Sequence, residues 1–119
     1  MKLFTKALAA KLAANGAKQA PLKGTGNEID FVPVVKLFNP AGAATWLLTE
    51  TDPDNPTIAF GLCDLGMGSP ELGYVDLDEL SGYRGRFGLG IERDLWFRPG
   101  KDTLSQFAQE ARGCGRIKA

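Results

Sequence analysis

The chain has 119 residues, of which 44% are hydrophobic and 24% are charged, and its formal net charge at pH 7 is zero. This length and composition predict one globular domain over residues 1–119 and exclude wholesale disorder. The sequence contains no histidine, which excludes Ser-His-Asp and Cys-His catalysis and histidine-bound zinc within one chain.

The first third of the chain predicts a helix followed by a loop. Phe4, Leu8 and Leu12 recur every fourth residue, which is typical of an amphipathic helix, here over about residues 3–15 and ending at Asn15-Gly16. Residues 17–31 contain Pro and Gly without a hydrophobic period and predict a loop.

The next segment predicts three short strands, of which the last two form a hairpin. Val and Leu runs alternate with polar residues, and an Asp/Asn/Pro cluster between the second and third runs is typical of a turn. Within the second strand, Trp46, Leu48 and Glu50 are expected on one face. The predicted strands are Val34–Phe38, Ala44–Thr51 and Thr57–Cys63, and the turn is Asp52–Pro56.

The rest of the chain predicts one or two further strands and two helices. We expect a strand or turn at Gly73–Asp76, then a short helix over Leu77–Leu80 capped by Asp76 or Asp78, and then a strand at Gly90–Phe97. The last helix should start near Asp102 or Thr103 and end at Gly113. Its buried residues would be Leu104, Phe107, Ala108 and Ala111. We therefore expect an α+β fold, with a domain core over about residues 33–116. An antiparallel β-meander of about four or five strands would carry both terminal helices on one face.

Charge is segregated along the chain although it sums to zero. Residues 1–36 hold six Lys and two carboxylates, residues 37–83 hold eight carboxylates and no base, and residues 84–119 hold eight bases and four carboxylates. Either these segments attract one another across the fold, or the acidic middle receives a basic partner or a cation and the basic ends receive nucleic acid.

The segment from Phe60 to Tyr74 combines four glycines with Asp64 and Glu71. It matches neither a dinucleotide fingerprint nor a phosphate-binding loop, so we expect a tight loop in which the two carboxylates accept backbone N–H bonds. Its carboxylates and glycines, with those of the last strand, form the predicted binding surface: Asp64, Gly66, Gly68, Glu71, Tyr74, Glu92 and Asp94.

Three functions are compatible with these residues. The favoured one is a non-enzymatic interaction module that binds another protein through the acidic loop. The second is nucleic-acid binding through Lys2, Lys6, Lys11, Arg84, Arg86, Arg93 and Arg98, which lie among Tyr83, Phe87, Trp96 and Phe97; the competing interpretation turns Trp96 and the other aromatic rings inward. The third is a metal-dependent hydrolase, which requires Asp64, Glu71 and Glu92 or Asp94 to lie within a few ångströms of one another.

The sequence also predicts where the protein resides and what it lacks. Cys63 and Cys114 are expected to be reduced thiols, Cys63 being buried and inert. Lys6 and Lys11 interrupt the apolar start, and no run approaches the roughly 20 residues that span a bilayer. We expect a cytoplasmic protein with no cofactor, no metal and no membrane partner.

Five motifs give the chain a family resemblance. They are Lys36-Leu-Phe-Asn-Pro40, Thr45-Trp-Leu-Leu-Thr-Glu50, Phe60-Gly-Leu-Cys-Asp-Leu-Gly-Met-Gly68, Pro70-Glu-Leu-Gly-Tyr74 and Ile91-Glu-Arg-Asp94. Over roughly residues 33–116 the chain resembles a family of small bacterial and plasmid-encoded proteins that form a domain of unknown function. The resemblance implies an unassigned bacterial protein, sometimes encoded among mobile-element genes, a context that slightly favours a DNA-related or accessory role and brings no assigned chemistry.

Overall fold

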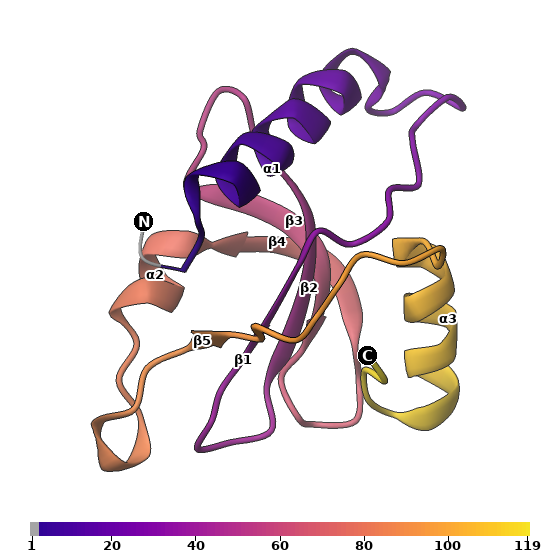
Figure 1. Ribbon diagram of the computed structural model, residues 1–119. Coiled ribbons are helices and arrows are strands. Elements are labelled where there is room, and N and C mark those ends of the chain that lie inside the picture. The colour runs from indigo at the N-terminus through magenta and orange to yellow at the C-terminus, as the bar shows by residue number, and fades with distance from the viewer. Residues whose placement is uncertain (1–2) are drawn as a thin grey trace.

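One antiparallel sheet of five strands forms the centre of the protein, with helices on both of its faces (Figure 1). The computed structural model describes residues 3–119. The strands are β1 Val35–Phe38, β2 Thr45–Thr51, β3 Ile58–Asp64, β4 Glu71–Asp76 and β5 Glu92–Arg93; the helices are α1 Lys6–Gln19, α2 Leu77–Gly82 and α3 Leu104–Cys114, and short 3-10 turns span Ala20–Leu22 and Arg86–Gly88. The predicted α+β class is confirmed.

The strand order places β4 and β5 at opposite edges of the sheet. Strands β1 to β4 follow one another as a meander, and β5 returns to pair with the outer side of β1, which gives the order β4-β3-β2-β1-β5. All four pairings are antiparallel. The strands β4 and β5 are therefore separated by the width of the sheet.

The two terminal helices lie on opposite faces, so the prediction that they share one face is wrong. Trp46 and Leu48 of β2 pack with Leu12 of α1 in one buried cluster. Leu47, between them in the strand, packs with Ala108 of α3 in a second cluster. Because successive strand residues point to opposite faces, the all-apolar run in β2 provides a core on each side.

Helix α1 continues past Asn15-Gly16, where the sequence predicted its end. Thr5 caps its first turn, its side-chain oxygen accepting the N–H of Leu8 at 3.1 Å. Asn15 is buried, and its amide donates to the main-chain oxygen of Thr49 at 2.9 Å. A Cβ on Gly16 would lie 1.8 Å from the oxygen of Thr51. Gly16 therefore serves close packing of the helix on β2, not helix termination.

A β-bulge in β2 reverses the expected face of Glu50. Leu48 pairs with Gly61, but Glu50 pairs with Phe60, so Thr49 is the additional residue. Because Phe60 and Gly61 point to opposite faces of β3, Leu48 and Glu50 do so as well. Glu50 therefore lies on the face opposite Trp46 and Leu48, contrary to the prediction.

The C-terminal half differs from the prediction in the lengths of its elements. β4 is a full strand, and Asp76 caps α2 by accepting the N–H groups of Asp78 and Glu79. β5 is shorter than expected because Asp94 turns the chain: its side chain accepts the N–H of Trp96 at 2.9 Å. Helix α3 continues through Gly113 and ends at Gly115, which has a positive φ of 78°.

Two helical glycines test the close packing of α1 on β2. Gly16→Ala should lower the free energy of unfolding by about 1–3 kcal/mol, because its Cβ meets a strand carbonyl that cannot easily move. Gly113→Ala is the matched control, since nothing lies within 4 Å of its added Cβ, and it should stabilise the protein by about 0.5–1 kcal/mol. Urea unfolding measures both, and equal effects would contradict this packing.

Candidate functional site

Asp64 is turned into the protein and holds the loop between β3 and β4. Only 3% of its surface is exposed. One carboxylate oxygen accepts the N–H of Gly66 at 2.8 Å, and the other accepts the N–H of Ile117 at 3.0 Å. Gly66 and Gly68 both have φ of 82°, a conformation that glycine adopts readily. The bond from Gly66 was predicted, and the bond from Ile117 in addition joins the glycine-rich loop to the C-terminal segment. The same prediction for Glu71 is wrong, because within residues 3–119 its carboxylate accepts no backbone N–H.

The outer surface of this loop is more apolar than acidic. Leu65 and Met67 project into solvent, and Met67 is 77% exposed. Glu71 is an exposed carboxylate at the start of β4, and Tyr74 is exposed in the middle of that strand. We define the loop surface as the exposed side chains of Leu65, Met67 and Glu71.

The carboxylates proposed for a metal-dependent hydrolase do not converge. Glu71 and Arg93 stand in one row across the five strands, separated by four strand spacings, or roughly 19 Å. Glu92 and Asp94 flank Arg93, and three spacings, roughly 14 Å, separate Asp64 from Glu92. Within residues 3–119 no group of three Asp, Glu or Cys side chains could hold a metal ion. The convergence that the hydrolase hypothesis requires is therefore absent among the described residues.

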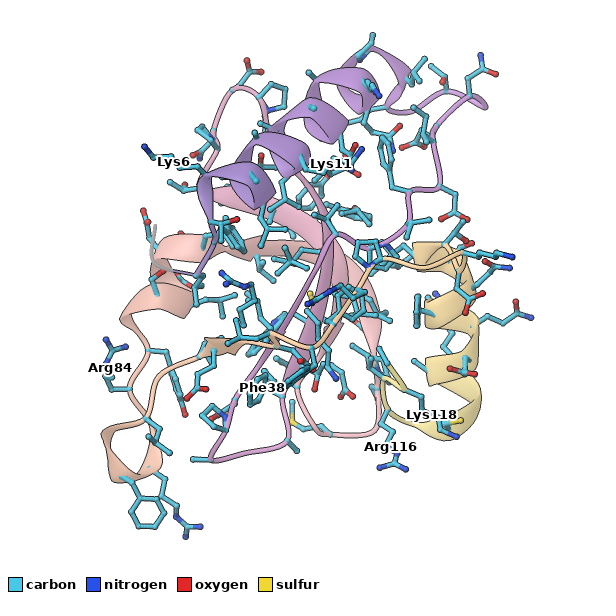
Figure 2. The ribbon with its side chains drawn as sticks, in the orientation of Figure 1. Lys6, Lys11, Phe38, Arg84, Arg116 and Lys118 are labelled. Carbon is cyan, nitrogen blue, oxygen red and sulfur yellow. The ribbon has the colours of Figure 1, made fainter. Side chains whose placement is uncertain are left out.

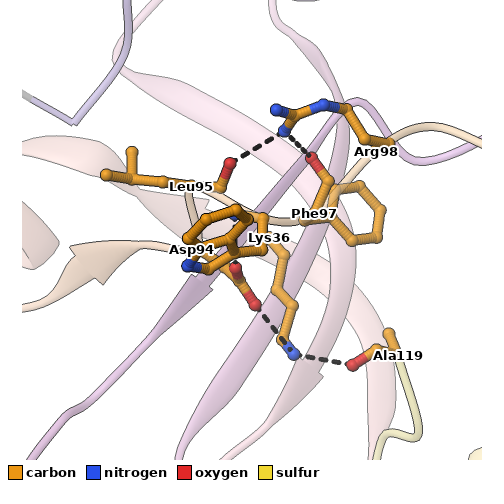
Figure 3. A network of polar contacts seen from close by, with 7 residues as sticks. Lys36, Asp94, Leu95, Phe97, Arg98 and Ala119 are labelled. Atoms are coloured by element: carbon orange, nitrogen blue, oxygen red, sulfur yellow. Dashed lines mark hydrogen bonds and ion pairs between the residues drawn. The ribbon is translucent and has the colours of Figure 1, made fainter.

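Around β5, Asp94 and Lys36 form a small polar network (Figure 3). The ammonium of Lys36 lies 3.3 Å from the Asp94 carboxylate and donates to the main-chain oxygen of Ala119 at 2.7 Å. The N–H of Trp96 and the nearby Lys36 together hold the pKa of Asp94 below its usual range. Glu92, the other predicted carboxylate here, is exposed. Asp94 therefore positions the turn and the ion pair.

The turn after β5 directs Trp96 away from the protein. Trp96 is 88% exposed and Phe87 is 86% exposed; Tyr83 is also exposed, whereas Phe97 packs on the α3 side of the sheet. The interpretation that these rings face inward is correct for Phe97 and wrong for the others. The second tryptophan, Trp46, is core as predicted, with 5% exposure.

The four arginines of this region keep their positive charge exposed or half-exposed. Arg98 donates to the carbonyls of Leu95 and Phe97 (Figure 3), and Arg84 donates to those of Ser81 and Tyr83. Arg93 donates to the carbonyl of Leu3 at 2.8 Å. The guanidinium of Arg86 lies 5.8 Å from the ring centre of Phe87. Carbonyls orient a guanidinium without neutralising it, so these groups can still attract an anion.

Two hollows adjoin the β5 segment. One, of about 880 Å³, is lined by Arg84, Arg93 and Leu95 among others. The second, of about 310 Å³, is lined by Lys36, Arg98 and the same Arg93 and Leu95. We define the β5 surface as the exposed side chains of residues 83–98 together with these two hollows.

The remaining basic residues named in the nucleic-acid hypothesis lie on or before α1. Lys6 and Lys11 project from this helix, and in the view of Figure 2 Lys6 lies on the same side of the molecule as Arg84, whereas Arg116 and Lys118 lie near the C-terminal end. Lys2 lies outside the described residues. Residues 3–119 contain one ion pair, Lys36–Asp94, so the basic ends and the acidic middle are not joined by direct pairs within them.

A polar cluster that the sequence did not predict lies near the other edge. Glu50 is buried, and burial raises the pKa of its carboxyl. Lys23, from the segment after α1, lies 5.3 Å from the ring centre of Tyr74. In the sequence, the one sign of this cluster is a charged residue, Glu50, within an otherwise largely apolar strand. The bulge and the path of residues 20–30 depend on tertiary contacts and cannot be predicted from local sequence.

The two free thiols should differ sharply in reactivity. Burial, with a smaller effect of Glu71, raises the pKa of Cys63 to about 11, whereas Cys114 is exposed. Because the thiolate is the reactive form, iodoacetamide near neutral pH should label Cys114 first and leave Cys63 largely unmodified. Mass spectrometry of the peptides measures both rates, and faster labelling of Cys63 would contradict its inert assignment.

Alanine substitutions at Asp64 and Glu71 should distinguish a buried structural carboxylate from an exposed one. Asp64→Ala removes two hydrogen bonds to a buried carboxylate and should cost about 2–4 kcal/mol of unfolding free energy. Glu71→Ala, an exposed matched control, should change that free energy by less than about 0.5 kcal/mol. Urea unfolding of both variants is the test, and a neutral Asp64→Ala would refute the anchoring role.

Comparison with known proteins identifies the family to which this chain belongs. Within the described chain, no helix has the length and apolar character needed to traverse a bilayer. Neither curated proteins nor solved structures give a match to this sequence. A family model described as "Protein of unknown function (DUF2958)" matches residues 3–118 and so includes α1 as well as the sheet. The chain therefore belongs to the DUF2958 family.

Proposed function

We propose that this domain binds single-stranded nucleic acid on the β5 surface. The observation that carries this proposal is the exposure of Trp96 and Phe87 in a segment, residues 83–98, that also contains four arginines. Exposed aromatic rings stack on unpaired bases, while basic side chains attract the phosphates between them. A double helix would not present its base faces to such rings.

The arrangement of the arginines supports the proposal. Arg84, Arg93 and Arg98 are each tied to main-chain carbonyls by one terminal nitrogen, so little side-chain freedom is lost when the other donors meet a phosphate. The two hollows share Arg93 and Leu95 and so adjoin the segment that carries the exposed indole. A cytoplasmic location, expected from the reduced cysteines, is part of the same proposal.

Fluorescence anisotropy with a labelled oligothymidylate tests the proposal. Trp96→Ala should weaken binding by roughly 5- to 150-fold, since one stacked base contributes about 1–3 kcal/mol. Leu65→Ala is the matched control, because Leu65 is an exposed apolar residue of the loop surface, and it should bind as the wild type does.

The salt dependence gives a second readout of the same experiment. Arg86→Ala should make the slope of log affinity against log salt less steep by about 0.7, the value expected for one phosphate contact with a single strand. Lys18→Ala, which removes an exposed base from the far end of α1, should leave the slope unchanged. Absence of binding at low salt, or full binding by Trp96→Ala, would overturn the proposal.

A second candidate function is binding to another protein, the function that the sequence favoured. The observation in its favour is the exposure of Leu65 and Met67 beside β4, because exposed apolar groups that adjoin one another commonly mark interaction sites. The partner would contact the exposed side chains of the loop surface and Tyr74. It would not contact Asp64, which the sequence predicted as part of the binding surface, because Asp64 is buried and already hydrogen-bonded.

A further inference from the structure

Strand β4 has an open hydrogen-bonding edge. The residue after β4, Leu77, donates its main-chain N–H to the main-chain oxygen of Thr57 at 2.7 Å, so Leu77 and Thr57 are a hydrogen-bonded pair. Hydrogen-bonded pairs alternate along an antiparallel ladder, so Glu71, Gly73 and Val75 exchange bonds with β3. Leu72 and Tyr74 consequently direct their main-chain N–H and C=O groups away from the sheet. Within residues 3–119 these groups have no hydrogen-bond partner.

The side chains of β4 do not block this edge. Leu72 and Tyr74 are exposed, and a Cβ on Gly73 would meet nothing within 4 Å. Natural edge strands are commonly protected by lysine, proline or a bulge, but β4 has the sequence Glu-Leu-Gly-Tyr-Val-Asp and a regular register with β3. Such an edge can accept an additional strand.

The charge around β4 indicates what kind of strand would bind. Glu71 and Asp76 stand at its two ends, and Asp78 and Glu79 follow in the first turn of α2. No Lys or Arg occurs between residues 37 and 83. A second copy of this chain would bring two such acidic edges together, which like-charge repulsion disfavours. The ammonium of Lys23 already lies over the Tyr74 ring, so this surface accommodates a lysine side chain.

We propose that β4 receives an extended, lysine-bearing segment of a partner protein as a sixth strand. Main-chain bonds to Leu72 and Tyr74 would hold the segment, and its lysines would meet the carboxylates at the ends of the strand. This proposal makes the second candidate function specific. It does not depend on nucleic-acid binding, because β4 and β5 are opposite edges of the sheet.

Binding of two labelled peptides tests the proposal. Both peptides have the same core of alternating valine and threonine. One carries lysine at both ends and the other carries glutamate at both ends. The lysine-ended peptide should bind at least about tenfold more tightly than the glutamate-ended peptide. Leu72→Pro should abolish binding because it removes an outward N–H while keeping the ladder to β3. Its circular dichroism and oligothymidylate binding should match the wild type, which separates loss of the edge from loss of the fold.

A charge variant gives a second test that leaves the backbone unchanged. Glu71→Lys should weaken binding of the lysine-ended peptide and strengthen binding of the glutamate-ended peptide. Glu71→Gln should give intermediate affinities for both. Equal binding of the two peptides, no binding of the lysine-ended peptide, or binding that survives Leu72→Pro would overturn the proposal. Dimerisation of the wild type through β4, measured by light scattering and lost in Leu72→Pro, would overturn it in favour of a second copy.

Discussion

The fold depends on the contact between α1 and the bulged strand β2. The bulge at Thr49 leaves a strand carbonyl without its regular partner, and the buried amide of Asn15 donates to it at 2.9 Å. The next residue, Gly16, allows the helix to approach the oxygen of Thr51. Because an unsatisfied buried carbonyl is costly, helix position and strand irregularity are determined together.

This contact also determines what each face of the sheet can do. With α1 and α2 on one face and α3 on the other, both faces of β2 are buried, so this strand offers no open face to a ligand. The accessible parts are the two edges, β4 and β5, and the connections beside them. These edges differ in charge: β4 lies in the segment without bases, and β5 carries the arginines.

Much of the local structure could be predicted from residue patterns. The hairpin follows from the Asp-Pro turn, the cap of α2 from Asp76, and the buried stripe of α3 from Leu104 and Ala108. These features depend on neighbours within a few residues. Membership of a family of unknown function was also confirmed, and the family match covers residues 3–118, which include the N-terminal helix.

The features that were missed depend on residues distant in sequence. The continuation of α1 through Gly16 requires knowledge of β2, 35 positions away in the case of Thr51. The separation of Glu71 from Glu92 follows from strand order, which no local pattern encodes. Trp96 has strand-like neighbours, yet Asp94 ends β5 and turns the indole outward. The candidate site lies where these nonlocal constraints act.

The two tryptophans allow a direct measurement of the nucleic-acid site. Each indole N–H gives one cross-peak in a ¹H–¹⁵N correlation spectrum; Trp96 is exposed on the β5 surface, and Trp46 is buried beneath α1. Titration with oligothymidylate should shift the Trp96 cross-peak progressively and leave that of Trp46 in place. An unmoved Trp96 cross-peak, or equal shifts of both, would contradict the assignment of nucleic-acid binding to the β5 surface.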